Sequence, residues 1–106
     1  KNSMIALGCE IYGQVENSVL SSNTVIEEGA VVKDSVIMSG TVVKSGANIQ
    51  YSIIDESVTI GRNATVGAEK ATAKGITVLG RGISVGAGAR VPDSAIIDKN
   101  VEGKED

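Results

Sequence analysis

The chain has 106 residues and a formal net charge of −3, and 42% of its residues are hydrophobic although only Tyr12 and Tyr51 are aromatic. Its basic residues are scattered and lack aromatic neighbours, which excludes a typical nucleic-acid-binding surface. No apolar segment approaches the roughly 20 residues that span a bilayer, so we expect no membrane partner. A single cysteine cannot form an internal disulfide, which favours a reducing, cytoplasmic location.

The chain begins inside a repeat. Residues 2–5 match the second half of a phrase with a recurring serine, found as Val15-Glu-Asn-Ser18, Val32-Lys-Asp-Ser35, Ile49-Gln-Tyr-Ser52 and Val91-Pro-Asp-Ser94. Because this start has no initiator methionine, we expect a fragment of a longer protein. The periodic serines are expected to bond to the backbone at turns. Between Ile11 and Ser18 the chain is longer than in later copies, which predicts a bulge or a lengthened side at residues 12–15.

A second phrase of seven residues recurs at 26–32, 43–49 and 60–66, a constant step of 17, and again at 85–91. A constant step indicates one structural unit stacked on itself. The aliphatic residues of each phrase lie six apart, which does not fit a helix, and their β-branched side chains favour strands. We therefore predict an all-β, single-stranded parallel β-helix of hexapeptide repeats, with about five coils within residues 1–101.

A small residue occupies the fifth place of this phrase. The members of this set are Cys9, Ala30, Ala47, Ala64 and Ala89. We expect each to point into the narrow interior of a corner, where Cys9 would be an inert core thiol. The residue before each of them is Gly or Asn, and these types tolerate the positive φ that a tight corner demands.

The larger interruption lies between Val66 and Val85, which are eight residues further apart than the corresponding residues Val32 and Val43. Residues 67–76 are small and polar, and we expect them to leave the stack as a loop insertion. Loops on regular scaffolds often carry function, so this loop is either a regulatory element or a tolerated insertion. Residues 102–106 are expected to form a polar tail.

The sequence contains no histidine. Hexapeptide acyltransferases, which this repeat pattern resembles, generally use a histidine as general base. The β-helical carbonic anhydrases bind their metal through histidines. We therefore expect no catalytic residue and no metal site in this chain.

The order of the motifs resembles the C-terminal β-helix domain of bacterial glucose-1-phosphate adenylyltransferases (ADP-glucose pyrophosphorylases). This resemblance covers nearly the whole chain and is carried by residues 2–5, Gly8-Cys9-Glu-Ile11-Tyr-Gly13, residues 15–20, 28–38 and 51–55. It implies a left-handed coil. It also implies an N-terminal nucleotidyltransferase domain, absent here, which uses magnesium and ATP to convert glucose 1-phosphate to ADP-glucose and pyrophosphate for glycogen biosynthesis.

In that family the β-helix packs on its own catalytic domain, contributes contacts to a homo- or hetero-tetramer and helps bind anionic allosteric effectors such as sugar phosphates. The resemblance therefore implies a regulatory and oligomerisation domain, without activity or a cofactor of its own, from a catalytic or a partner subunit. Arg62 and Arg81 are the nearest matches to the family's effector-binding lysines, and their guanidinium groups suit forked hydrogen bonds to phosphate. Three alternatives stay open: two solvated arginines, an acyltransferase-like protein without the usual histidine, and a purely structural solenoid.

Overall fold

The computed structural model describes residues 2–104 and consists of short strands in three parallel sheets. Sheet A contains β1 (Met4–Ile5), β4 (Val19–Leu20), β7 (Val36–Ile37), β10 (Ser52–Ile54), β13 (Thr77–Leu79) and β16 (Ile96–Ile97). Sheet B contains β2 (Glu10–Ile11), β5 (Val25–Ile26), β8 (Val42–Val43), β11 (Thr59–Ile60) and β14 (Ser84–Val85). Sheet C contains β3 (Gln14–Glu16), β6 (Val31–Lys33), β9 (Asn48–Gln50), β12 (Thr65–Val66) and β15 (Arg90–Val91).

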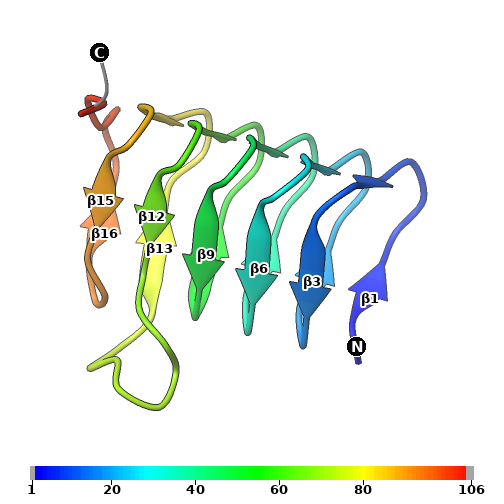
Figure 1. Ribbon diagram of the computed structural model, residues 1–106, viewed down its shortest axis with the longest axis horizontal. Helices are drawn as coiled ribbons and strands as arrows, with labels where there is room; N and C mark the ends of the chain where they lie inside the picture. Colours follow the sequence, from blue (N-terminus) through cyan, green and yellow to red (C-terminus); the bar gives the residue numbers. More distant parts are fainter. Residues whose placement is uncertain (1, 105–106) are drawn as a thin grey trace.

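The chain visits sheets A, B and C in turn, so each coil adds one strand to each side of a three-sided stack (Figure 1). This parallel β-solenoid confirms the predicted fold class. It has about six turns and not five, because β16 and a bridge between Val85 and Val101 begin a further turn. We number the coils 1 to 6 from the N-terminus and name the corners A–B, B–C and C–A after the sheets they connect.

The strand register explains why the repeat is 17 residues long. Buried side chains mark the three sides of coil 2, at Leu20 in sheet A, Ile26 in sheet B and Val32 in sheet C. These residues are six apart, but only five residues separate Val32 from Ile37, which begins coil 3. The C–A corner is therefore one residue shorter than the other two corners.

Aliphatic side chains of all three sheets fill the interior. The core consists of Leu20, Ile26, Val32, Ile37, Val43, Ile49, Ile54, Ile60, Val66, Leu79, Val85 and Val91, with alanines and Val58 and Ile83 at the corners. Each is at least 95% buried. Tyr12 lies outside this core and is exposed, so the stacked β-branched residues replace the large aromatic residues of an ordinary globular core.

Most corners carry one residue with positive φ. In the B–C corner these are Gly29, Gly46, Asn63 and Gly88, and in the A–B corner Gly8, Asn23, Gly40, Ser57 and Gly82. The C–A corner carries Asn2, Asn17, Asp34, Tyr51 and Ser94. The expected positive φ before each small residue is thus confirmed, whereas, among the described residues, the C–A corners carry a positive-φ glycine only at Gly67, where the long loop begins.

Coil 1 differs from the sequence-based expectation. Ile11 pairs with Ile26, and Val15 pairs with Val32. Only Tyr12 and Gly13 connect β2 to β3, so this corner is two residues shorter than that of coil 2, and the predicted bulge or lengthened side at residues 12–15 is wrong. A Cβ atom on Gly13 would collide with the Ala30 carbonyl oxygen. A glycine at this position therefore allows the backbone to turn this corner with only two connecting residues.

The same register moves Cys9 to a different corner. Because Glu10 pairs with Val25, Cys9 lies in the A–B corner at the level of Thr24, and its assignment to the alanine position is wrong. Its thiol is half-buried against the core, and Sγ donates to the Ser21 carbonyl oxygen at 3.1 Å. Ala30 and Ala47 are buried in the B–C corner, as expected for the small residue of the phrase.

Candidate functional site

The recurring serines form a ladder of hydrogen bonds along the C–A corner. Ser18 Oγ donates to the Glu16 carbonyl oxygen at 2.7 Å, and Ser35 Oγ donates to that of Lys33 at 2.7 Å. Ser35 N–H donates in turn to Ser18 Oγ at 3.1 Å, and Ser52 N–H donates to Ser35 Oγ at 3.1 Å. The predicted backbone role is confirmed for these three serines, which serve the fold and are not free nucleophiles.

Ser94 does not continue this ladder. Val78 pairs with Ile96, a step of 18, so Ala95 and not Ser94 lies opposite Thr77. Ser94 instead occupies the positive-φ position of the corner, with φ of 66°, so its alignment as the fourth copy of the recurring serine is wrong. The cause is one extra residue in the C–A corner after coil 5. In coil 5 the ladder position holds Thr77, which is buried and donates through Oγ1 to the Pro92 carbonyl oxygen at 2.8 Å.

Residues 67–76 contain no strand and project from the stack between β12 and β13 (Figure 1). The loop is tied back at its end, where the Lys74 N–H donates to Asp93 Oδ2 at 2.6 Å. Within it, the N–H groups of Thr72 and Ala73 both donate to the Glu69 carbonyl oxygen. These bonds give the loop a defined turn of its own.

The loop borders two hollows at the C–A corner, which we call the loop crevice. One hollow, of about 310 Å³, is lined by Asn17, Val19, Asp34, Ser35, Val36, Tyr51 and Lys70. The other, of about 520 Å³, is lined by Lys33, Asp34, Gln50, Glu69, Lys70 and Ala71. Because Lys70 lines both hollows, this side of the loop borders corner residues of earlier coils, such as Asp34 and Tyr51.

The loop crevice combines charges of both signs with an aromatic ring. Lys33 and Lys70 line one hollow together with two acidic residues, Asp34 and Glu69. Tyr51, with φ of 50°, adopts a backbone conformation that bulky residues rarely take. Such a surface suits a ligand that has both hydrogen-bond donors and acceptors. The sequence pointed to the loop but not to these residues, because the corner columns are visible only once the register is known.

A third hollow, of about 520 Å³, lies at the B–C corner and is acidic. It is lined by Tyr12, Glu27, Glu28 and Ser45. The Tyr12 hydroxyl donates to Glu10 Oε1 at 3.2 Å, and this bond, together with the carboxylate charge, raises the pKa of Tyr12. Glu27 Oε1 accepts the Ser45 N–H at 3.0 Å. The two glutamates make this hollow unsuitable for an anion.

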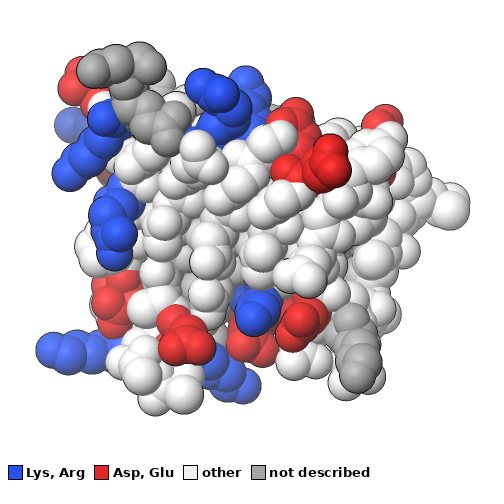
Figure 2. Space-filling model, viewed as in Figure 1, with Lys and Arg blue, Asp and Glu red and all other residues white. Residues whose placement is uncertain are grey.

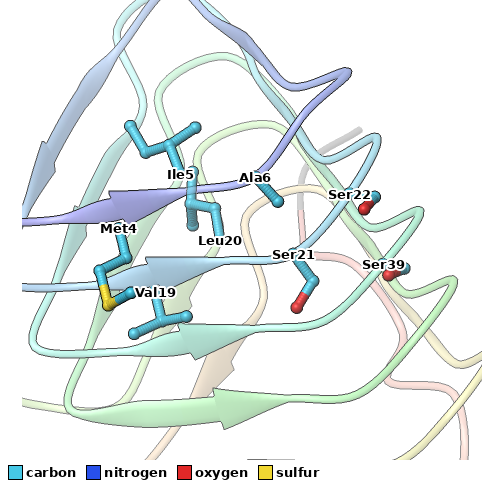
Figure 3. Close-up of a pocket in the computed structure, with 8 residues that line it drawn as sticks. All are labelled: Met4, Ile5, Ala6, Val19, Leu20, Ser21, Ser22 and Ser39. Carbon is cyan, nitrogen blue, oxygen red and sulfur yellow. The ribbon is translucent and has the colours of Figure 1, made fainter.

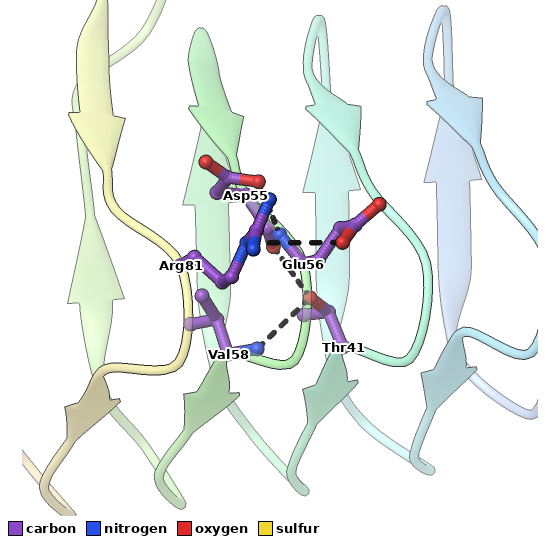
Figure 4. A network of polar contacts seen from close by, with 5 residues as sticks. All are labelled: Thr41, Asp55, Glu56, Val58 and Arg81. Atoms are coloured by element: carbon purple, nitrogen blue, oxygen red, sulfur yellow. Dashed lines mark hydrogen bonds and ion pairs between the residues drawn. The ribbon is translucent and has the colours of Figure 1, made fainter.

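Arg62 and Arg81 lie at different corners. Arg62 belongs to the B–C corner between β11 and β12, and Arg81 to the A–B corner between β13 and β14. Both are exposed. Arg81 Nε lies 3.8 Å from Glu56 Oε1 (Figure 4), an exposed ion pair that contributes about 0–1 kcal/mol. The structure therefore does not bring the two arginines together into one site.

The corner beneath Arg81 is held by buried polar contacts. Thr41 Oγ1 donates to the Asp55 carbonyl oxygen at 2.8 Å and accepts the Val58 N–H at 3.2 Å (Figure 4). Thr41 and Val58 are both buried. The Gly82 N–H donates to the Glu56 carbonyl oxygen at 2.9 Å and ties the backbone next to Arg81 to this corner.

The described residues place further limits on the chemistry. Across residues 2–104, no three His, Cys, Asp or Glu side chains form a group that would hold a metal ion. No helix in this part of the chain is long and apolar enough to cross a membrane. Figure 2 shows acidic and basic side chains along the edges of one face, with an uncharged band between them.

Curated relatives share the sequence across much of this chain. The glucose-1-phosphate adenylyltransferase of Acetivibrio thermocellus is 34% identical over 114 residues, which cover 99% of this chain and 27% of that protein. The enzyme of the same name from Corynebacterium jeikeium is 38% identical over 67% of this chain and 18% of that protein. The chain thus spans about a quarter or less of the length of these relatives.

Solved structures with the same fold are acetyltransferases. The acetyltransferase domain of PglB from Neisseria gonorrhoeae, in complex with acetyl coenzyme A, superposes with a TM-score of 0.83 at 15% identity, over 95% of this chain and 48% of that chain. A mutant of GDP-perosamine N-acetyltransferase from Caulobacter crescentus gives a TM-score of 0.82 at 12% identity, over 96% and 48%. At these identities the likeness shows the fold alone.

The family is shown by a model described as GlmU-like, C-terminal hexapeptide, which matches residues 1–85. This match agrees with the repeat pattern and with the three-sided stack. The curated relatives confirm the resemblance to glucose-1-phosphate adenylyltransferases. The chain therefore belongs to the GlmU-like C-terminal hexapeptide family and is a β-helix related to part of the glucose-1-phosphate adenylyltransferases.

Proposed function

We propose that this β-helix is a regulatory and oligomerisation module of a glucose-1-phosphate adenylyltransferase and has no catalytic activity by itself. The observation that carries the proposal is the match over 99% of this chain to 27% of such an enzyme. In the proposed parent protein, a separate nucleotidyltransferase domain converts ATP and glucose 1-phosphate to ADP-glucose and pyrophosphate, with magnesium. A cytoplasmic location and a role in glycogen biosynthesis belong to the same proposal.

The β-helix is suited to such a role because it is stiff. Each strand of coils 1 to 4 pairs with its counterpart in the next coil, and buried side chains fill the interior from coil 2 to coil 5. A stiff stack can hold a catalytic domain and a neighbouring subunit at fixed positions. Its loops and corners remain available for ligands.

A graft onto the Acetivibrio thermocellus relative tests this role. If the matching part of that enzyme is replaced by this chain, we expect the chimera to form ADP-glucose, because the module would support the catalytic domain as the native segment does. The measurement is pyrophosphate release from ATP and glucose 1-phosphate. The control is the same enzyme with the matching part deleted. Equal activity of the chimera and the truncated enzyme would contradict the proposal.

The proposed effector contacts are Arg62 and Arg81, each acting from its own corner. In the chimera, Arg62→Gln or Arg81→Gln should raise the concentration of an activating or inhibiting sugar phosphate needed for half its effect by about tenfold, since a forked hydrogen bond to phosphate is lost. Arg90→Gln is the matched control, because Arg90 is also exposed but points outward from β15. An unchanged response in both variants would exclude these contacts and leave the loop crevice, with Lys33 and Lys70, as the anion site.

The alternative function is that of an acyltransferase-like protein, which the fold of the solved acetyltransferases favours. The absence of histidine from the sequence argues against the usual general base. Calorimetry with acetyl coenzyme A distinguishes the two functions. Heat of binding that saturates would support the alternative. Absence of binding to this compound and to sugar phosphates would favour a purely structural solenoid.

A further inference from the structure

Tyr51 has a backbone conformation that its residue type disfavours. It lies at the positive-φ position of the C–A corner, with φ of 50°. Other copies of this corner hold small polar residues at the same position, namely Asn2, Asn17, Asp34 and Ser94. Asparagine and aspartate tolerate this conformation because their short side chains bond to nearby backbone, whereas a tyrosine has no such compensation. An outlier of this kind points to a role for Tyr51 beyond the fold.

The residues around Tyr51 offer polar groups that the protein itself does not use. Tyr51 is half-buried and lines the smaller hollow of the loop crevice together with Asn17, Asp34 and Lys70. Within residues 2–104, the side chains of these four residues form no hydrogen bond or ion pair with another protein group. Their donors and acceptors are therefore available to a ligand in this hollow.

The charges of the loop crevice cancel. Lys33 and Lys70 line its larger hollow together with Asp34 and Glu69, and these opposite charges form no ion pair with one another in the described part of the chain. A ligand with a single net charge gains no overall attraction from such a set. A neutral ligand with many hydroxyl groups can use both signs, because a hydroxyl donates to acceptors and accepts from donors.

Two other hollows of the molecule lack this combination. The hollow of about 580 Å³ beside coils 1 and 2 is lined by apolar residues and serines, with no charged or aromatic residue among them (Figure 3). The hollow at the B–C corner is lined by Tyr12 and two glutamates but by no basic residue. Of the hollows compared, the loop crevice alone combines an aromatic residue with acidic and basic side chains. An aromatic ring can pack on the C–H groups of a sugar ring while polar side chains bond to the sugar hydroxyls.

We propose that the loop crevice binds a neutral saccharide, with one sugar ring packed on Tyr51. Asn17, Asp34 and Lys70 supply the groups that bond to its hydroxyls. The two hollows, of about 310 Å³ and about 520 Å³, both fall within the range of roughly 300–1,000 Å³ usual for small-molecule sites. Because they share Asp34 and Lys70, a saccharide of two or more units can occupy both. This inference goes beyond the proposed function, since it involves neither of the two arginines and no sugar phosphate.

Tyrosine fluorescence tests the proposal, because the chain contains two tyrosines and no tryptophan. In Tyr12→Phe all tyrosine emission comes from Tyr51, and in Tyr51→Phe it comes from Tyr12. Three neutral disaccharides serve as probes: maltose, cellobiose and lactose. At least one of them should change the emission of Tyr12→Phe in a saturable way, with a dissociation constant on the order of 1 mM, as an open hollow binds weakly. The emission of Tyr51→Phe should not change, since Tyr12 lies at another corner.

Tyr51→Asn separates a binding role from a packing role. Asparagine already occupies the equivalent position at Asn17, so we expect the melting temperature to equal or exceed that of the wild-type chain. The affinity for the disaccharide should fall at least about tenfold, measured from the amide resonances of Asp34 and Lys70 during a titration. Tyr12→Asn is the matched control and should keep the wild-type affinity. A lower melting temperature with unchanged affinity would show that Tyr51 serves packing alone and would overturn the proposal.

Two further probes distinguish the class of ligand. Inorganic phosphate represents an anion and alanine a zwitterion, and neither should displace the disaccharide at equal concentration. Tighter binding of phosphate than of the disaccharides would make the crevice an anion site, and tighter binding of alanine would make it a site for zwitterions. Either result would overturn the proposal, as would a Tyr51 emission that responds to none of the three disaccharides. Since only this chain is used, failure here is separate from the activity test of the chimera.

Discussion

Ile54→Ala is expected to lower the free energy of unfolding by about 2–5 kcal/mol. Ile54 is fully buried in coil 4, between Ile37 and Leu79 of the neighbouring coils. Truncation removes apolar contacts and leaves a cavity. Hydrogen bonds hold the strands on both sides at a fixed spacing, so the stack cannot collapse to fill that cavity. Urea unfolding followed by circular dichroism measures the loss.

The neighbouring isoleucine provides the control. Ile53 is the same residue type in the same strand, but it faces outward. Ile53→Ala should cost less than about 1 kcal/mol. Equal losses for the two variants would mean that the assignment of inward and outward faces in β10 is wrong.

Ser35→Ala should have the second large effect, a loss of about 1–3 kcal/mol. The Ser35 hydroxyl donates to the Lys33 carbonyl oxygen and accepts the Ser52 N–H. Without it, the Ser52 N–H loses its partner at a position where Ser35 itself is only 3% exposed, whereas the Lys33 carbonyl oxygen keeps the Tyr51 N–H at 3.0 Å. Each unsatisfied buried group costs about 1–3 kcal/mol. Thermal unfolding monitored by calorimetry provides the measurement.

Two further variants separate the hydroxyl from the general effect of a substitution at this corner. Ser35→Thr should retain most of the stability, because Thr77 occupies the equivalent position in coil 5 with its hydroxyl bonded to backbone. Ser22→Ala, at an exposed serine, should change the stability by less than about 0.5 kcal/mol. If Ser35→Thr were as unstable as Ser35→Ala, the ladder would not be the source of the effect.

The regular part of the fold can be predicted from the sequence because each copy of the repeat has the same pattern of core and corner residues. Isoleucine or valine every six or five residues, with glycine or asparagine at the corner, specifies the strand, the turn and the stacking together. The alanines of the B–C corner lie where the phrase places them. Local preference and global packing agree at these positions, so one repeat predicts the next.

The irregular parts do not follow, because a phrase fixes a local shape but not its register. Ile5–Ile11 has the aliphatic spacing of both the A–B and the B–C side, and six residues separate the inward positions in each case. The sequence therefore cannot assign Cys9 to its corner. Ser94 fails in the same way, since a single extra residue moves it from the ladder to the turn. Strand pairing resolves both cases.

The candidate site was predictable only in part. Residues 67–76 are recognisable as an interruption, but the hollows that the loop borders are also lined by residues of coils that are distant in sequence. Lys70 lines the same hollow as Asn17, some fifty residues earlier in the chain. Arg62 and Arg81 look related in sequence because each follows an aliphatic-glycine pair, and the fold separates them onto two corners.

The short C–A corner has a consequence for how such a chain changes in length. The insertion after coil 4 raises the separation of paired residues from 17 to 25, as in the pairs of Ile53 with Val36 and with Val78. Loop-closure entropy grows only with the logarithm of length, so this increase costs about 0.3 kcal/mol. A corner segment is thus nearly free to lengthen, whereas a strand residue is fixed by neighbours on both sides. Insertions are therefore tolerated at the corners of such a stack, and after each insertion the chain must return to the register set by the paired strands.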